Sequence, residues 1–222
     1  MGRPAVRPLY AFFHVYTDGD WFEPLDDYLT AVKGSGLDAE MWFGIVGDRT
    51  HDGDVIRTVM DCGFDYNFAA LEDSGFEQVT LRDMVEHATE GGNHGFYLYS
   101  HTKGAWANSQ PDTPDETKRL NVAWRRSMFH DLIGGWRRCV ELLESGEWDA
   151  VGSHRIHAPH GNGYFGGNSW WATADYLRTL PPVSDESRYE AEVWIARNPD
   201  GRLFDLRPGW PGFGVFAKEA VA

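Results

Sequence analysis

The chain has 222 residues, of which 42% are hydrophobic and 14% aromatic, a composition that predicts a single folded domain over residues 1–222 and excludes an intrinsically disordered chain. The formal net charge of −14 disfavours nucleic acid as a partner, because an acidic field repels polyanions unless basic residues are concentrated on one face. The two cysteines, Cys62 and Cys139, favour a reducing compartment. We expect no membrane span and no secretory signal, and therefore a cytoplasmic protein.

The first half of the chain alternates between apolar segments typical of strands and segments typical of helices. Residues 1–8 form a basic arm that we expect to be flexible. Thr80 is the expected N-cap of a helix that ends at Gly91. This alternation predicts an α/β fold with a mostly parallel sheet and helices on both faces. The expected strands lie at residues 9–16, 39–48 and 95–100, and the expected helices at residues 23–33 and 80–91.

The second half is less regular. Residues 107–118, rich in Pro, Asp and Thr, are expected to form a surface loop that either covers a site or is simply solvated. A long amphipathic helix over residues 117–146 is expected to bend or divide at Gly134 and Gly135. The remaining expected elements are a strand over residues 148–154, a glycine-rich loop over residues 155–168 and helices over residues 169–180 and 184–198.

The stretch YLYSHTKGAW places a polar cluster, His101, Thr102, Lys103 and Gly104, directly after the strand over residues 95–100. In parallel sheets, ligands bind at the carboxyl ends of strands. A lysine followed by a glycine can present an ammonium and backbone N–H groups to a phosphate, and His101 could donate to the same anion or to a sugar hydroxyl. The alternative is a polar turn at the edge of the sheet.

Arg125 is out of place in the long helix. A projection at about 100° per residue puts it inside the apolar arc. An unpaired buried guanidinium is very costly, so Arg125 needs a carboxylate, a carbonyl oxygen or a ligand anion. A role at a binding site and a structural salt bridge are equally compatible with this position.

The segment YFGGNSWWATADYL has features that suit a sugar ring. Gly166 and Gly167 let the backbone approach a ligand, and Asn168 offers both a donor and an acceptor. Trp170 and Trp171 offer flat faces with N–H donors. The alternative is that both tryptophans are core residues of the helix expected here.

The segment YEAEVWI places Glu192 and Trp194 on a short helix. A carboxylate near a sugar pocket could take the proton from an acceptor hydroxyl, the role of a general base in group transfer. Glu190 would face elsewhere on the helix, so Glu192 is the candidate base.

His154, His157 and His160 recur at regular spacing in HRIHAPH and could bind Zn²⁺ or Mn²⁺. Their spacing matches no established metal motif, so unliganded histidines are the alternative. Asp18 and Asp20 also have oxygen atoms suited to a divalent metal, but Asp-Gly is ordinary turn sequence. The chain has no G-x-S-x-G, Walker, H-E-x-x-H or dinucleotide glycine motif, which weakens hydrolase, NTPase and dehydrogenase functions.

The segments FYLYSHTKG, NVAWRRSM, WDAVGSH, YFGGNSWWATADYLRTLP and RYEAEVWI resemble, in this order, segments of a family of glycosyltransferase-like proteins from bacteria and viruses. The opening of the chain is also similar to the family's first strand and helix, so the resemblance extends from about residue 9 to residue 197. It implies a GT-A-like, Rossmann-like fold and transfer of a hexose from a nucleotide-sugar donor to a hydroxyl of a glycan or small molecule. A UDP-sugar such as UDP-glucose is the expected donor, and the host cytoplasm is the expected location if the chain is viral.

The resemblance also implies roles for individual residues. The expected donor-binding residues lie at two strand ends and on the long helix: His14, Tyr16, His101, Thr102, Lys103, Gly104 and Arg125. The expected sugar- or acceptor-binding residues are Gly166, Gly167, Asn168, Trp170, Trp171 and Trp194, and the expected catalytic residues are Glu192 and Lys103. His101 and Lys103 stand where many GT-A enzymes carry an Asp-x-Asp metal site, so no metal is expected to be required, although Mn²⁺ or Mg²⁺ stays open. Lys103 and Arg125 could instead neutralise the leaving diphosphate.

Three alternative functions remain open. A viral DNA glycosyltransferase acting on hydroxymethylated bases would need a basic surface, for which Arg119, Arg126, Arg137 and Arg138 are candidates. A carbohydrate-binding protein would keep the pocket without the chemistry. A metal-dependent hydrolase would be built on the three histidines.

Overall fold

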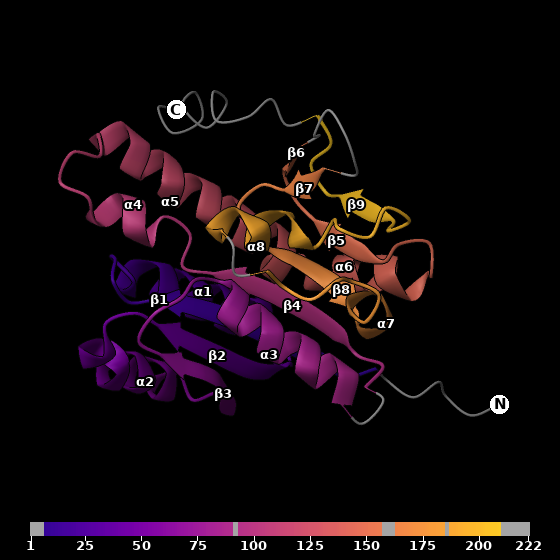
Figure 1. The fold of residues 1–222 in the computed structure, drawn as a ribbon, viewed down its shortest axis with the longest axis horizontal. Helices are drawn as coiled ribbons and strands as arrows, with labels where there is room; N and C mark the ends of the chain where they lie inside the picture. Colours follow the sequence, from indigo (N-terminus) through magenta and orange to yellow (C-terminus); the bar gives the residue numbers. More distant parts are fainter. Residues whose placement is uncertain (1–6, 91–92, 157–162, 185–186, 210–222) are drawn as a thin grey trace.

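The computed structural model describes residues 7–90, 93–156, 163–184 and 187–209, which form an α/β domain with helices on both faces of a central sheet (Figure 1). Among these residues the sheet has seven strands in the order β3-β2-β1-β4-β8-β5-β9. Neighbouring strands are parallel except at β8, which is antiparallel to both β4 and β5. The strands of this sheet are β1 (Leu9–Tyr16), β2 (Glu40–Val46), β3 (Tyr66–Glu72), β4 (Phe96–His101), β5 (Ala150–Gly152), β8 (Trp170–Thr173) and β9 (Leu203–Asp205). A separate antiparallel ribbon pairs β6 (Arg155–Ile156) with β7 (Tyr164–Phe165).

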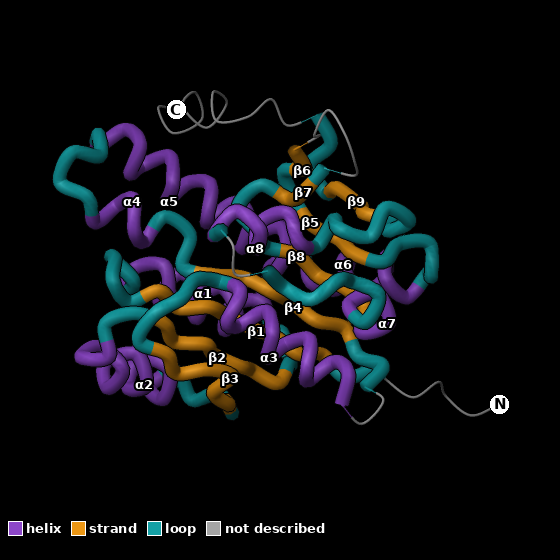
Figure 2. Tube along the Cα trace, in the orientation of Figure 1, coloured by secondary structure: helices purple, strands orange, loops and turns teal. Residues whose placement is uncertain are grey.

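The helices follow the strands along the chain, and Figure 2 shows α3 crossing in front of the sheet. They are α1 (Phe22–Ser35), α2 (Asp52–Asp61), α3 (Gln78–Thr89), α4 (Ala105–Ser109), α5 (Asp115–Phe129), α6 (Trp136–Glu144), α7 (Ala174–Leu177) and α8 (Arg188–Trp194). A 3₁₀ turn (Arg49–His51) precedes α2, and a π-helical turn (His130–Gly134) separates α5 from α6. The predicted division of the long helix at its glycine pair is therefore confirmed.

The alternation of side chains along the strands divides the core into two apolar clusters, one on each face of the sheet. In β1, Phe13 packs into the cluster that contains α1, α2, α5 and α6, whereas Phe12 packs into the cluster that contains α3, α7 and α8. Apolar residues of one chain segment thus anchor helices on both faces, which holds the strand ends in a fixed arrangement.

The strand and helix predictions for the first half of the chain are confirmed, with one correction. Thr80 is not an N-cap, because α3 begins at Gln78 and Thr80 lies inside the helix. A Cβ on Gly44 of β2 would lie 2.0 Å from the Thr80 hydroxyl, so the glycine provides the space in which α3 packs this closely on the sheet. The helix position of Thr80 is set by this packing and not by capping.

The loop predicted over residues 107–118 is shorter than expected. α4 includes residues 105–109 and α5 begins at Asp115, so only residues 110–114 lie between the two helices. Pro114 precedes the first residue of α5, a position that a proline tolerates because it needs no helical hydrogen bond there. α4 and α5 are thus joined by a short turn.

The helix predicted over residues 169–180 is wrong in its first half. Trp170–Thr173 form strand β8 between β4 and β5, and only Ala174–Leu177 are helical. Trp170 and Trp171 fill opposite apolar clusters, which a strand allows because successive side chains point to opposite faces. A helix would have placed both on neighbouring parts of one surface.

Candidate functional site

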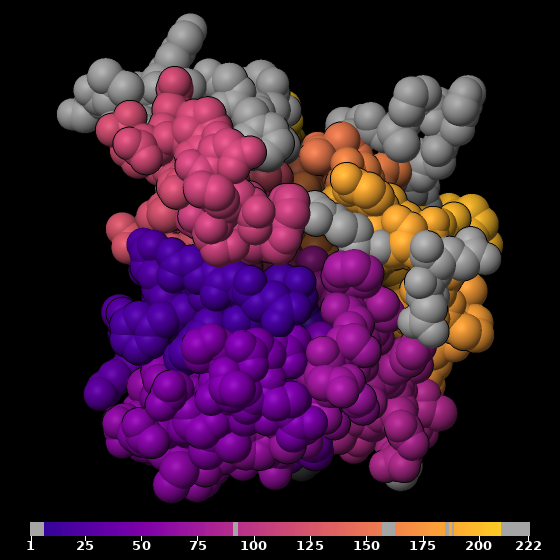
Figure 3. Space-filling model, turned by 60° about the vertical axis from the view of Figure 1, so that its left-hand side comes forward, coloured from indigo at the N-terminus to yellow at the C-terminus, as the bar shows by residue number. Residues whose placement is uncertain are grey.

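A cavity of about 390 Å³ lies at the carboxyl ends of β1 and β4. Figure 3 shows this face of the molecule, where the N-terminal residues in indigo, the α4–α5 residues in pink and the C-terminal residues in yellow meet around a recess. This volume falls within the range of small-ligand sites. The cavity is lined by His14, Tyr16, Phe76, Glu77, His101, Thr102, Lys103, Gly104, Ala105, Trp106, Ala107, Asn121 and Glu192.

The parallel pairing of β1 and β4 brings the predicted polar residues together. His14 is the register partner of His101, so the two imidazoles start from neighbouring positions on the sheet. Beyond the paired residues, the Thr102 amide donates to the His14 carbonyl oxygen at 2.9 Å, and the Tyr16 amide donates to the Thr102 hydroxyl at 3.0 Å. Thr102 therefore joins the two strand ends, and the predicted strand-end cluster lines the cavity as a unit.

Lys103 supplies a positive charge to this cavity. Its ammonium lies 4.6 Å from the centre of the Trp124 ring, a cation–π contact. Within the described part of the chain, no carboxylate lies within ion-pair distance of this ammonium. A charge held against an aromatic ring, without a carboxylate to neutralise it, is available to an incoming anion.

Gly104 gives the turn after β4 its shape. Its φ of 88° lies in the left-handed region, which favours glycine. A Cβ at this position would also lie 3.0 Å from the Cβ of Asn121 on α5. The glycine predicted to follow the lysine is therefore required by both the backbone and the packing.

Glu77, which the sequence did not indicate, is the hydrogen-bonding centre of the cavity floor. Its side chain is only 17% exposed and its Oε1 lies 3.1 Å from Nδ1 of His101. Its other oxygen accepts hydrogen bonds from the Asn168 side chain and, at 3.5 Å, from the Tyr99 hydroxyl. Burial would raise the pKa of Glu77, but the charge and hydrogen bond of His101, together with Asn168, lower this pKa to about 2. Glu77 is thus a carboxylate held ionised at the floor of the cavity.

His101 has both ring nitrogens engaged. Nε2 lies 2.8 Å from the Gly167 carbonyl oxygen, and Nδ1 faces the Glu77 carboxylate. Both partners only accept hydrogen bonds, so an imidazolium satisfies the two contacts at once. His101 therefore has no ring N–H left to donate to a ligand, contrary to the prediction, and its charge is balanced by Glu77.

His14 provides a neutral polar group beside this ion pair. Its Nδ1 lies 2.9 Å from the Thr80 hydroxyl, and its side chain is buried. Burial lowers the pKa of His14 to about 4, with the neighbouring His101 acting in the same direction against the opposing effect of Glu77. His14 is therefore uncharged at neutral pH.

Glu192 lines the cavity. It is partly exposed on α8, and no hydrogen bond or ion pair to another described residue engages its carboxylate. Glu190, two residues earlier, pairs with Arg197 instead. By contrast, Trp194 is buried and its indole N–H donates to the Pro181 carbonyl oxygen at 2.8 Å, so it packs α8 into the core and does not line the cavity.

The segment over residues 166–171 does not line the cavity. Trp170 and Trp171 are fully buried, and their indole N–H groups donate to Asn168 and to the Leu132 carbonyl oxygen. A Cβ on Gly167 would lie 2.5 Å from the Met128 sulfur, so this backbone approaches α5 and not a ligand. Gly166 likewise packs against Trp124. The predicted sugar-framing arrangement is therefore corrected: within this segment, Gly167 contacts His101 and Asn168 contacts Glu77.

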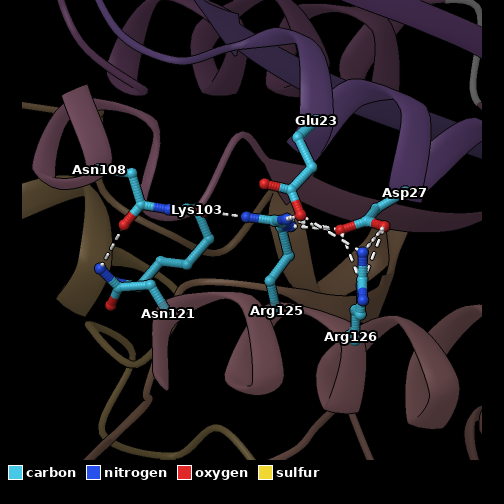
Figure 4. Close-up of polar contacts among 7 residues, drawn as sticks. All are labelled: Glu23, Asp27, Lys103, Asn108, Asn121, Arg125 and Arg126. Carbon is cyan, nitrogen blue, oxygen red and sulfur yellow. Dashed lines mark hydrogen bonds and ion pairs between the residues drawn. The ribbon is translucent and has the colours of Figure 1, made fainter. Parts of the chain in front are cut away.

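Arg125 is fully buried and does not line the cavity. Its Nε donates to Asp27 at 3.0 Å, Nη2 lies 3.3 Å from Glu23, and Nη1 donates to the Lys103 carbonyl oxygen at 3.2 Å (Figure 4). The structural salt bridge is therefore the alternative that the structure contains. The expectation that the Arg125 guanidinium binds the donor directly is therefore wrong, because this side chain does not line the cavity.

Two exposed aromatic residues, which the sequence did not indicate, stand at the cavity. Phe76 is 43% exposed and Trp106 is 51% exposed, and both contribute to its lining. Exposed aromatic faces beside a polar floor suit a flat ring such as a nucleobase or the C–H face of a sugar. Phe76 lies just before α3 and Trp106 lies in α4, and local sequence pattern does not indicate that the two meet at one cavity.

The histidines considered as metal ligands do not form a described site. His157 and His160 lie outside the described residues. His154 is buried, with Nδ1 2.9 Å from the Ser153 hydroxyl and Nε2 3.4 Å from the Ser127 hydroxyl. Burial, and secondarily the charge of Arg207, lower the pKa of His154 to about 4.

The described residues do not provide a ligand set for the divalent cation that GT-A-like folds suggest. Among them, no three His, Cys, Asp or Glu side chains are grouped as a metal site. In the cavity, the Glu77 carboxylate is already bound by His101 and Asn168, and Lys103 contributes a positive charge. An ammonium and an occupied carboxylate are poor partners for Mn²⁺ or Mg²⁺.

Solved structures of other proteins share this fold at low sequence identity. A mannosyltransferase from Pyrobaculum calidifontis in complex with GDP-Man and Mn²⁺ is 12% identical with a TM-score of 0.52, over 92% of this chain and 56% of that chain. Glucosyl-3-phosphoglycerate synthase from Mycobacterium tuberculosis, in complex with Mn²⁺, UDP and glucosyl-3-phosphoglycerate, is 10% identical with a TM-score of 0.47, over 98% and 78% of the two chains. A 4-diphosphocytidyl-2C-methyl-D-erythritol synthase from Anaerococcus prevotii is 11% identical with a TM-score of 0.48, over 90% and 87%.

No family model and no curated protein matches this chain. No helix in the described ranges is long and apolar enough to cross a bilayer. The likeness to the mannosyltransferase shows the fold: the chain is an α/β domain whose mostly parallel, helix-covered sheet is shared with that protein.

Proposed function

We propose that the protein is a glycosyltransferase that binds a nucleotide-diphosphate sugar in the cavity at the ends of β1 and β4. The observation that carries this proposal is Lys103, which lines the cavity and whose ammonium has no carboxylate partner among the described residues. The shared fold of a mannosyltransferase that binds GDP-Man supports the same function. A diphosphate is the ligand for which such a charge at a strand end is suited.

The proposed reaction moves a sugar from the diphosphate to an acceptor hydroxyl. The acceptor oxygen forms a bond to the anomeric carbon, and the bond from that carbon to the diphosphate oxygen breaks, its electron pair leaving with the diphosphate. Glu192 takes the acceptor proton as general base. Lys103 stabilises the negative charge that develops on the leaving diphosphate, an effect that is large in a preorganised site.

We propose that this transfer needs no metal. The cavity offers Lys103 for the diphosphate, while its buried carboxylate Glu77 is neutralised by His101. Without this ion pair, the negative charge of Glu77 would repel the donor diphosphate. Because His101 offsets this charge, the cavity can bind an anion although a carboxylate lies in its floor. The roles of Tyr16, Thr102 and Gly104 are to shape the diphosphate site, and Phe76 and Trp106 offer faces for the base or the sugar.

We favour a UDP-sugar as donor and a glycan or small molecule as acceptor over modified DNA. Three of the four arginines that would have to bind DNA are engaged within the protein: Arg126 pairs with Asp27, Arg138 with Glu141, and Arg137 stacks on Trp136. An arginine that is already paired within the protein neutralises DNA phosphates less well and so releases fewer counterions from the DNA, which weakens DNA binding. A carbohydrate-binding protein without turnover is the second candidate, and the presence of the Glu192 carboxylate in the cavity lining favours the enzyme.

The proposal is tested by calorimetric titration of UDP, GDP, dTDP and CMP into the wild type, Lys103→Met and Lys33→Met. Lys33 is an exposed lysine in the last turn of α1 and serves as the control for removal of one positive charge. We expect one nucleoside diphosphate to bind, with affinity about 10- to 100-fold weaker in Lys103→Met and unchanged in Lys33→Met, because a charge-assisted phosphate contact is lost only in the first. Failure of all nucleotides to bind the wild type would contradict the proposed function.

A further inference from the structure

The turn that carries Lys103 is held on several sides by hydrogen bonds. The Lys103 amide donates to the His101 carbonyl oxygen at 2.7 Å, and the Ala105 amide donates to the Thr102 carbonyl oxygen at 3.0 Å. The Lys103 carbonyl oxygen accepts from Nη1 of Arg125 at 3.2 Å. The direction of the lysine backbone therefore depends on a guanidinium that comes from α5.

Arg125 is itself anchored to α1. Its Nε and Nη2 both donate to Asp27, and Nη2 also pairs with Glu23, so all three guanidinium nitrogens are engaged (Figure 4). The side chain is 0% exposed and the Asp27 side chain is 14% exposed. The planar guanidinium donates toward the carboxylates and toward the carbonyl oxygen at once, which a lysine ammonium cannot do with the same fixed geometry. A continuous chain of contacts thus runs from α1 through Arg125 to the lysine turn.

The same helix also contacts the other end of Lys103. Trp124, adjacent to Arg125 on α5, lies under the lysine ammonium at 4.6 Å. One helical turn earlier, the Asn121 amide donates to the Asn108 side chain of α4 at 3.0 Å (Figure 4). α5 therefore holds the backbone of Lys103, its ammonium and the helix that follows it.

We propose that Arg125 is a positioning residue for diphosphate binding: anchored by Asp27 and Glu23, it fixes the Lys103 carbonyl and so aims the lysine ammonium into the cavity. This inference rests on the proposed function. Arg125 does not touch the donor and acts on it only through Lys103. Replacement of Arg125 is therefore expected to weaken binding of the phosphates and not binding of the nucleoside.

Arg126 provides a matched control on the same helix. It pairs with Asp27 and Glu23, as Arg125 does, but its side chain is 59% exposed and it makes no hydrogen bond to the lysine turn. A change at Arg126 perturbs the same carboxylates and leaves the contact to Lys103 intact. A comparison of variants at Arg125 and Arg126 therefore distinguishes loss of lysine positioning from a general loss of charge pairing.

The test compares wild type, R125K, R126K, Lys103→Met and the double variant R125K/Lys103→Met. The probes are UDP, GDP or dTDP, whichever binds the wild type, and the corresponding nucleoside without phosphate. We expect R125K to weaken diphosphate binding by about tenfold and R126K by less than about twofold, and we expect R125K to have no further effect once Lys103 is replaced, because contacting residues are energetically coupled. Affinity for the nucleoside is expected to be equal in all variants.

Three outcomes would overturn the positioning role while leaving the proposed function intact. R125K and R126K could weaken diphosphate binding equally, the effects of R125K and Lys103→Met on this binding could be additive, or R125K could weaken nucleoside binding as much as diphosphate binding. Absence of diphosphate binding by the wild type would overturn both. If R125K does not fold, as judged by thermal melting, Asp27→Asn loosens the anchor without removing the guanidinium and is expected to weaken diphosphate binding in the same selective way. Unchanged diphosphate affinity in Asp27→Asn would then count against the inference.

Discussion

At the residue scale, the local pattern of the sequence was a good guide where a polar residue directly follows a strand. His14, Thr102 and Lys103 line the cavity because the ends of parallel strands lie at the same edge of a sheet. Glu77 was missed because its partners, His101 and Asn168, are distant in sequence and no local spacing marks the contact. Its place just before α3, at the carboxyl edge of the sheet, is the one signal that could have drawn attention to it.

The tryptophan pair shows the opposite error. The segment WWAT suggests either flat faces for a sugar ring or core residues of a helix. The residues form a strand, so Trp170 and Trp171 point to opposite faces and both are buried. Likewise, the helical projection correctly placed Arg125 in a buried position, but its partners on α1 could be identified only from the fold.

The proposed role of Glu192 as general base leads to a prediction that separates chemistry from binding. Glu192→Gln removes the base while keeping the size of the side chain, so kcat of sugar transfer is expected to fall by about 100-fold or more with little change in affinity for the nucleoside diphosphate. Glu190→Gln is the control, because Glu190 pairs with Arg197 and does not line the cavity. Steady-state kinetics and calorimetry measure the two quantities. Equal kcat values in Glu192→Gln and the wild type would remove Glu192 from the mechanism.

At the element scale, the sequence predicted β1, β2, β4, α1 and α3 because apolar strand segments and glycine stops are strong signals there, but it did not predict α2 or β3. The second half depends on contacts between segments. β8 is inserted antiparallel between β4 and β5, and it is stabilised by its neighbours more than by its own pattern. The short α4 follows from the Gly104 turn and from packing on α5, neither of which local composition reveals.

Gly104 allows a test of the turn between β4 and α4. Gly104→Ala places a side chain at φ 88° and a Cβ 3.0 Å from Asn121, so we expect a loss of about 1 to 3 kcal/mol in the free energy of unfolding and weaker diphosphate binding. Gly34→Ala is the control, because Gly34 lies in helix α1 with open space around it, and it is expected to stabilise by about 0.5 kcal/mol. Urea denaturation measures both changes. A Gly104→Ala protein as stable as the wild type would show that the turn tolerates a side chain.

At the scale of the whole molecule, the buried histidines predict sensitivity to acid. The pKa values of His14 and His154 are lowered from 6.5 to about 4 by burial. Between these values the unfolded chain binds more protons than the folded one, so the stability that these residues contribute is complete above about pH 6.5 and is lost as the pH falls toward 4. Each shift corresponds to about 3 kcal/mol. Glu77, with its pKa lowered to about 2, adds a further loss below about pH 4.5.

The free energy of unfolding, measured by urea denaturation from pH 8 to pH 4, should therefore fall steadily below pH 6.5. His154→Gln should flatten this dependence. His94→Gln is the control, because the His94 side chain is 68% exposed, and it should leave the dependence unchanged. A constant free energy of unfolding between pH 7 and pH 5 would contradict the buried, neutral state of these imidazoles.

The overall arrangement combines a fold shared with a mannosyltransferase and a cavity lined by a lysine and by a carboxylate paired with His101. The central claim is that this cavity binds the diphosphate of a nucleotide sugar through Lys103 without a metal. The most direct measurement is a calorimetric titration of UDP, GDP and dTDP into the wild-type protein at fixed ionic strength, first with EDTA and then with MnCl₂. We predict that one of them binds with the same affinity under both conditions, whereas binding that appears only with Mn²⁺, or no binding under either condition, would contradict the claim.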